Sequence, residues 1–175
     1  MTDAIASIRH LLGSAAVFIV VFVVSLRLFA LLWARQAFAD VAKQPGGWVG
    51  AIIVVACSAI IHELLHGFAW KIFGRVPWKS ISFRPSWRVM GFVAHVDVPL
   101  PASAYRASAA LPALVLGGLP IGTGLVTGSG LFVLWGLFFL LECFGDIAVL
   151  LAMRRVPSRA WVLDHPSRLG CRLVD

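Results

Sequence analysis

Four long apolar segments constrain the fold of this chain more than any other feature of its sequence. A helix that crosses a membrane needs about 20 apolar residues, each rising about 1.5 Å. Segments of that length lie at about residues 11–34, 48–73, 107–128 and 131–153. Hydrophobic residues make up 60% of the chain and charged residues 13%, against about 45–50% and about 25% in soluble domains. We therefore expect an integral, multi-pass membrane protein.

The turns between these segments are short, so the helices should form one bundle. Pro45-Gly46-Gly47 breaks the chain between the first two segments, and Thr127-Gly128-Ser129-Gly130 between the last two. No internal repeat is visible, which predicts a single membrane-embedded domain over residues 1–175. Residues 80–83 and 92–98 alternate in character and indicate a small β-hairpin. The predicted class is an all-α membrane protein, a bundle of four transmembrane helices with a β-hairpin between helices 2 and 3.

Basic residues near the segment ends predict the orientation. Six Lys or Arg residues lie in segment 71–106 and five in segment 154–175, whereas the opposite side has only Arg35 and Lys43. Cytoplasmic loops carry the excess of Lys and Arg. Both termini should therefore be cytoplasmic, with 154–175 as a tail, in what we expect to be a bacterial inner membrane. Because the net charge of +7 comes from these flanking residues, we expect contact with the lipid bilayer and no nucleic-acid partner.

The run His62-Glu63-Leu64-Leu65-His66 lies inside the second apolar segment. On a helix, the spacing of four residues stacks both imidazoles on one face, within reach of one zinc ion. Glu63 points about 100° away, so we expect it to act as a general base on an activated water rather than to bind the ion. Ionisable groups inside a bilayer are rare and usually functional. A purely structural role for these residues is therefore the weaker interpretation.

A hydrolytic zinc site has three protein ligands and an open fourth position, and the fourth apolar segment offers Glu142 and Asp146. His66 lies eight residues before Gly74 and Asp146 eight before Arg154, at the cytoplasmic boundary, which gives both a depth of about 12 Å. We therefore predict Asp146 as the third ligand, with Gly145 allowing close helix approach. Glu142 lies one turn deeper. It remains an alternative ligand, a hydrogen-bond partner of a ligand imidazole, or a partner for Arg27.

Two further groups are weaker candidates. His95 and Asp97 share the polar face of the second hairpin strand. They could contact substrate, but a solvated strand face explains them more simply. Asp164-His165-Pro166 in the tail is typical of a turn or a helix start, so we expect a capping role there.

The sequence His62 to Gly67, HELLHG, followed by an aspartate in a later apolar segment, resembles the site-2-protease-like intramembrane metalloproteases. The chain resembles the putative zincin peptidase family more closely, over about residues 55–171. The features that carry the resemblance are HELLHG, His95-Val96-Asp97-Val98-Pro99-Leu100-Pro101 leading through Tyr105 to Leu111-Pro112, Gly145-Asp146-Ile147, and Asp164-His165-Pro166 with Gly170. This resemblance implies a zinc peptidase with His62, His66 and Asp146 as ligands and Glu63 as catalytic base.

The order of residues at the aspartate departs from the site-2 proteases, which place it before a glycine, whereas Gly145 precedes Asp146 here. In that broader group an edge strand near the active site receives unwound substrate, and the hairpin at 80–98 is a candidate for this role. The resulting hypothesis is an intramembrane zinc metalloprotease that cleaves membrane proteins or peptides near the cytoplasmic boundary. The alternative is a non-enzymatic membrane protein that uses zinc for stability or sensing. A transporter is disfavoured because four spans without a repeat are atypical of one.

Overall fold

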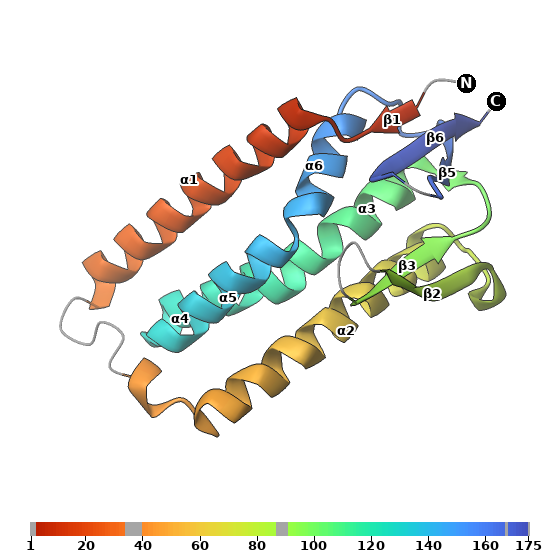
Figure 1. The fold of residues 1–175 in the computed structure, drawn as a ribbon. Helices are drawn as coiled ribbons and strands as arrows, with labels where there is room; N and C mark the ends of the chain where they lie inside the picture. The colour runs from red at the N-terminus through yellow and green to blue at the C-terminus, as the bar shows by residue number, and fades with distance from the viewer. Residues whose placement is uncertain (1–2, 34–39, 87–90, 167, 175) are drawn as a thin grey trace.

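The computed structural model describes residues 3–33, 40–86, 91–166 and 168–174 and is mostly helical (Figure 1). The α-helices are α1 (Ile8–Trp33), α2 (Gly47–Phe73), α3 (Ala102–Pro112), α4 (Leu119–Thr127), α5 (Gly130–Glu142) and α6 (Phe144–Met153). Shorter helical segments are η1 (Val41–Lys43), η2 (Trp78–Ser80) and the π-helical η3 (Ala113–Gly118). Arg35 and the end of the first predicted segment, residue 34, lie outside the described residues.

Among the described residues, three helices are long and apolar enough to cross a membrane. They are α1, α2 and the continuous helix over 102–127 formed by α3, η3 and α4. The segment predicted as a fourth helix at 131–153 is instead a pair, α5 and α6, bent by 56°. The pair counts as one further span only if both halves cross together, which gives three or up to four membrane helices.

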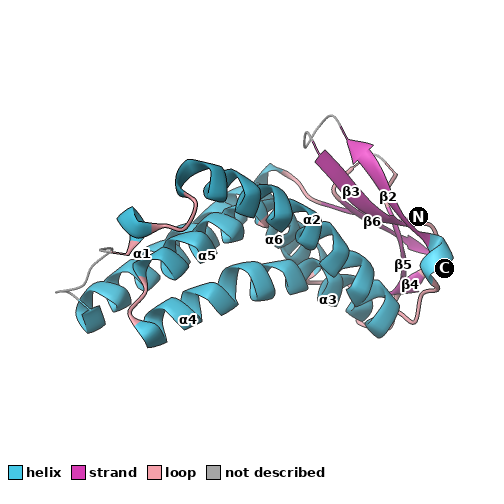
Figure 2. Ribbon diagram, turned by 90° about the horizontal axis from the view of Figure 1, so that it is seen from below, coloured by secondary structure: helices cyan, strands magenta, loops and turns pink. Residues whose placement is uncertain are grey.

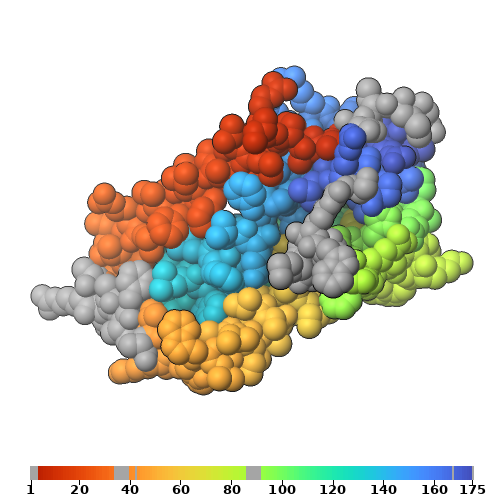
Figure 3. All heavy atoms as spheres, viewed as in Figure 1, coloured from red at the N-terminus to blue at the C-terminus, as the bar shows by residue number. Residues whose placement is uncertain are grey.

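Small residues let α5 pack tightly against the helix at 102–127. A Cβ at Gly136 of α5 would lie 2.6 Å from the carbonyl oxygen of Gly117, so no side chain fits there. Pro112 lies inside this helix and is followed directly by the π-helical turn η3. Proline has no backbone N–H to donate, and the wider turn accommodates this gap in the helical hydrogen bonds. In the space-filling view, α5 and α6 occupy the surface between α1 and α2 (Figure 3).

Two small sheets gather at one end of the helices (Figure 2). Between α2 and α3, β2 (Ile81–Ser86) pairs antiparallel with β3 (Gly91–Val96). The other sheet has the order β1 (Asp3–Ile5), β6 (Gly170–Val174), β5 (Trp161–Asp164) and β4 (Leu100–Pro101), with all neighbours antiparallel. The all-α prediction missed this four-stranded sheet. The segment predicted as a tail supplies two of its strands, and the pairing of β1 with β6 brings both chain ends together (Figure 1).

The main hydrophobic core lies where the four-stranded sheet meets the helices. Leu100, Val162 and Met153 are fully buried in it. At its edge, Gly170 has a φ of +125°, and a Cβ there would lie 2.2 Å from the carbonyl oxygen of Ala4. Glycine is therefore required where β1 closes onto β6. The sheet is thereby fixed beside α3 and α6.

Candidate metal centre

One face of α2 is buried and carries both histidines. His62 and His66 are each 9% exposed, whereas Leu64 between them is 38% exposed. Because residues four apart on a helix lie on the same face, the Nε2 atoms of the two rings approach to 3.2 Å. The helix thus presents two imidazoles side by side to the interior of the protein.

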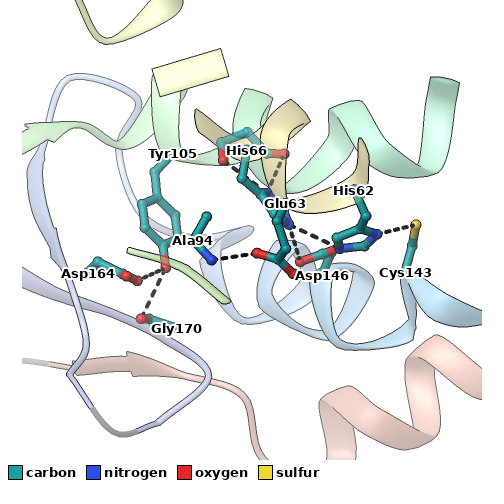
Figure 4. Close-up of polar contacts among 10 residues, drawn as sticks. His62, Glu63, His66, Ala94, Tyr105, Cys143, Asp146, Asp164 and Gly170 are labelled. Carbon is teal, nitrogen blue, oxygen red and sulfur yellow. Dashed lines mark hydrogen bonds and ion pairs between the residues drawn. The ribbon is translucent and has the colours of Figure 1, made fainter. Parts of the chain in front are cut away.

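Asp146 faces these imidazoles from the first turn of α6, just after the bend between α5 and α6. Its Oδ2 lies 3.1 Å from Nε2 of His62, and its Oδ1 lies 3.4 Å from Nε2 of His66 (Figure 4). The expectation that Gly145 allows close helix approach is wrong, because a Cβ there would meet only Leu169, at 3.8 Å. The change in chain direction at the bend brings the carboxylate to α2.

The orientation of the histidine rings leaves their Nε2 atoms free to bind a cation. Nδ1 of His66 lies 3.1 Å from the carbonyl oxygen of Ser108 on α3. Since a carbonyl only accepts hydrogen bonds, Nδ1 carries the hydrogen and Nε2 presents its lone pair. Nδ1 of His62 lies 3.7 Å from Sγ of Cys143, so that ring also turns Nε2 toward Asp146.

The three side chains fit a zinc ion. Zinc bonds to nitrogen and oxygen of about 2.0–2.2 Å place tetrahedral ligand atoms about 3.3–3.6 Å apart. The observed separations are 3.1, 3.2 and 3.4 Å. Although Nε2 of His62 is close, Oδ2 of Asp146 is buried and meets no hydrogen-bond donor in suitable geometry among the described residues. A cation would satisfy these converging lone pairs.

Besides these three side chains, two overlapping sets of described residues have ligand atoms within 4.8 Å of one another. They are His62, Glu63 and His66, and His62, Cys143 and Asp146. Cys143 approaches Nδ1 of His62, whereas Asp146 approaches Nε2. The thiol and the carboxylate therefore lie closest to different nitrogens of one ring.

Glu63 extends from α2 toward β3. Its Oε2 accepts a hydrogen bond of 2.5 Å from the backbone N–H of Ala94 (Figure 4). The N–H of Asp97 donates to the carbonyl of Ser80 on the β2 side, and successive amides of a strand point in opposite directions. Ala94 therefore directs its N–H away from β2, along an edge that pairs with no other strand in the described chain. The hydrogen bond from Ala94 to Glu63 could not be predicted from the sequence, because almost every residue type has a backbone N–H.

Glu142 contacts α2 away from the two imidazoles. Its Oε2 accepts a hydrogen bond of 3.3 Å from Oγ of Ser58, one turn before His62. The ion pair with Arg27 that the sequence suggested does not form within the described residues. Glu142 therefore lies near the site and is held by a hydroxyl.

The structure separates the roles of the two polar hairpin residues. Asp97 is 48% exposed and pairs with Arg84 at 3.2 Å, as expected for a solvated strand face. That interpretation is wrong for His95, whose side chain is 16% exposed and whose Nδ1 lies 2.5 Å from Oδ2 of Asp164. This hydrogen bond holds the pKa of His95 above its usual value. The capping role expected for Asp164 is also wrong, because Asp164 lies in β5 and accepts a hydrogen bond of 2.6 Å from the hydroxyl of Tyr105.

Gly67, which follows the second histidine, lets the hairpin pack onto α2. A Cβ there would lie 3.1 Å from Cζ of Phe83 and 3.5 Å from side-chain carbons of Ile81 and Trp78. The longer branches of valine would push these side chains away. We therefore expect Gly67→Val to lower the free energy of unfolding by about 1–3 kcal/mol, measured as a lower thermal midpoint in detergent.

The matched control for this substitution is Gly122→Val. A Cβ at Gly122 meets no atom within 4 Å, so the same change on another apolar helix adds β-branching without a clash. Equal thermal midpoints for the two variants would contradict close packing of the hairpin against Gly67.

Comparison with known families agrees with this geometry. A family model described as putative zincin peptidase matches residues 55–161, which is more than half of the chain. The match includes His62, Glu63, His66 and Asp146 and ends before Asp164. No curated protein and no solved structure gives a significant match. The match indicates a zinc metallopeptidase, and the chain belongs to the putative zincin peptidase family.

Proposed function

We propose that this protein is an intramembrane zinc metalloprotease that hydrolyses peptide bonds of membrane proteins or peptides near the cytoplasmic boundary. In this proposal His62, His66 and Asp146 hold the zinc ion and Glu63 is the catalytic base. The observation that carries it is the convergence of two imidazole nitrogens and a buried carboxylate within 3.4 Å, beside a second carboxylate on the same helix. A relationship to the site-2-protease-like enzymes, a bacterial inner-membrane location and cytoplasmic termini belong to the same proposal.

The chemistry divides between the ion and Glu63. When bound, zinc supplies Lewis-acid catalysis, because it acidifies water and polarises a peptide carbonyl. Glu63 accepts the proton of the attacking water and delivers it to the leaving amine, so that one C–O bond forms as the C–N bond breaks. The hydrogen bond from Ala94 holds the Glu63 carboxylate in one orientation while it does so.

The substrate must expose an extended segment at the site. Backbone carbonyls of a membrane helix are hydrogen-bonded within the helix, so cleavage requires local unwinding, which Gly, Pro or polar residues favour. The edge of β3 that faces Glu63 can pair with an extended chain through main-chain hydrogen bonds. We therefore place the scissile peptide along this edge, beside Glu63, with His95 of β3 and Asp97, which follows β3, as candidate contacts.

Metal analysis combined with a cleavage assay tests the proposal. The full-length wild type should contain zinc and cleave co-expressed single-span substrates, and His62→Ala should lose both properties. His10→Ala serves as the control, because Nδ1 of His10 accepts a hydrogen bond only from nearby Ser7 on the N-terminal side of α1. This variant should keep zinc and activity. A wild type purified without zinc would reject the metal assignment.

A further inference from the structure

The carboxylate of Asp164 joins two elements that both contact α2. Its Oδ2 lies 2.5 Å from Nδ1 of His95 on β3. Its Oδ1 accepts a hydrogen bond of 2.6 Å from the hydroxyl of Tyr105 on α3 (Figure 4). The hydroxyl of Tyr105 also lies 3.1 Å from the carbonyl oxygen of Gly170. Asp164 and His95 side chains are 14% and 16% exposed. One largely buried carboxylate therefore links the four-stranded sheet to both the hairpin and a membrane helix.

On the hairpin side, the Asp164–His95 contact lies next to the residue that binds Glu63. His95 follows Ala94, whose N–H donates to Glu63. The other bonds that hold β3 run to β2, which itself packs on α2 through side chains. The ion pair between His95 and Asp164 is thus a polar contact that fixes β3 relative to the rest of the protein. A shift of β3 would move the N–H of Ala94 away from Glu63.

On the helix side, the link reaches a histidine of the metal site. Tyr105 and Ser108 are three residues apart on α3, on the same face. The carbonyl of Ser108 contacts Nδ1 of His66. Asp164 therefore binds the hydroxyl of Tyr105 on the same helix whose Ser108 carbonyl orients the ring of His66.

We propose that Asp164 is a positioning residue, which holds β3 and α3 so that Ala94 orients Glu63 and Ser108 orients His66. This inference rests on the proposed function for its effect on catalysis, although its effect on geometry does not. Asp164 lies beyond the residues that the family model matches, and it acts without touching substrate or metal. It gives the four-stranded sheet a role in the chemistry of the membrane site.

Amide hydrogen exchange in the purified full chain tests the geometric part. Asp164→Asn keeps the shape of the side chain but removes the charge beside Nδ1 of His95, whose Nε2 remains 3.3 Å from Oδ1 of Asp97. We expect exchange at the Ala94 amide to rise by about tenfold or more. The Asp97 amide, which donates to Ser80 of the same hairpin, should exchange at the wild-type rate. Tyr105→Phe removes one hydroxyl and should raise exchange at Ala94 less, which keeps the test decisive if Asp164→Asn does not fold.

Cleavage kinetics test the catalytic part. Asp164→Asn should lower kcat about tenfold and change KM less, because the misplaced base acts only in the chemical step, whereas the main-chain groups of β3 that pair with substrate are retained. Asp40→Asn is the matched control. Its carboxylate accepts a hydrogen bond from Ser129, and the segment before α2 lies at the opposite end of the helices from β3 (Figure 1). This control should leave kcat and exchange at Ala94 unchanged.

Two results would overturn the inference. In the first, the Ala94 amide remains as protected in Asp164→Asn as in the wild type. In the second, the Ala94 and Asp97 amides lose protection together, which would mean that the hairpin merely unfolds. If the wild type holds zinc but cleaves no substrate, the proposed function fails, while the exchange comparison still decides whether Asp164 positions β3.

Discussion

Glu63→Gln is expected to retain zinc and to abolish measurable cleavage. The glutamine amide has nearly the size of the carboxylate, and its oxygen can still accept the hydrogen bond from Ala94. What it lacks is the ability to take a proton from water and return it to the leaving amine. General acid–base catalysis contributes about 100- to 10,000-fold to the rate, so cleavage should fall by a factor in that range. The measurement is the cleavage rate per zinc-loaded enzyme.

Glu142→Gln provides the control, because Glu142 is the other glutamate of the chain and also lies in an apolar helix. Its carboxylate accepts a hydrogen bond from Ser58, which a glutamine oxygen can replace. This variant should keep most of the activity. Undiminished cleavage by Glu63→Gln would reject Glu63 as the base, and loss of zinc in the same variant would assign Glu63 to the metal instead.

The helical part of the fold could be predicted because hydropathy alone encodes it. A segment such as Gly47–Phe73 must satisfy all its backbone groups within the bilayer, and a helix is the structure that does so locally. The bend between α5 and α6 could not be predicted, since Glu142-Cys143-Phe144 contains neither proline nor glycine. The four-stranded sheet was missed because short strands such as Asp3–Ile5 and Leu100–Pro101 are defined by partners far away in the sequence.

In the candidate site, too, local features could be predicted from the sequence, whereas contacts between distant segments could not. The spacing of His62 and His66 is local, so the sequence alone placed both imidazoles on one helix face. The proximity of Asp146 to His66 could be predicted because both residues lie equally far from the ends of their apolar segments, and therefore at the same depth. The contacts of Ala94, Ser108 and Asp164 depend on how a hairpin, a helix and a sheet dock together. Two of the three are made by backbone atoms, which every residue type possesses.

Asp146→Ala and Glu142→Ala should separate the third ligand from its neighbour. Removal of a group that only orients a ligand weakens metal binding about 10- to 100-fold. The Asp146 carboxylate lies 3.1 Å from His62 and 3.4 Å from His66 and is the proposed ligand itself. Its removal should therefore weaken zinc binding by more than about 100-fold. Glu142→Ala should leave zinc bound, because the Glu142 carboxylate contacts Ser58. Zinc affinity measured by competition with a chelator compares the two variants.

Each outcome of this comparison has a distinct meaning for the function. If only Asp146→Ala loses zinc, the wild-type site has three protein ligands and an open position for water, as hydrolysis requires. Loss of zinc only in Glu142→Ala would contradict the assignment of Asp146. If both substitutions release the ion, four protein side chains close the site. A closed site is typical of structural zinc, and such a result would favour a zinc-stabilised or zinc-sensing membrane protein over a protease.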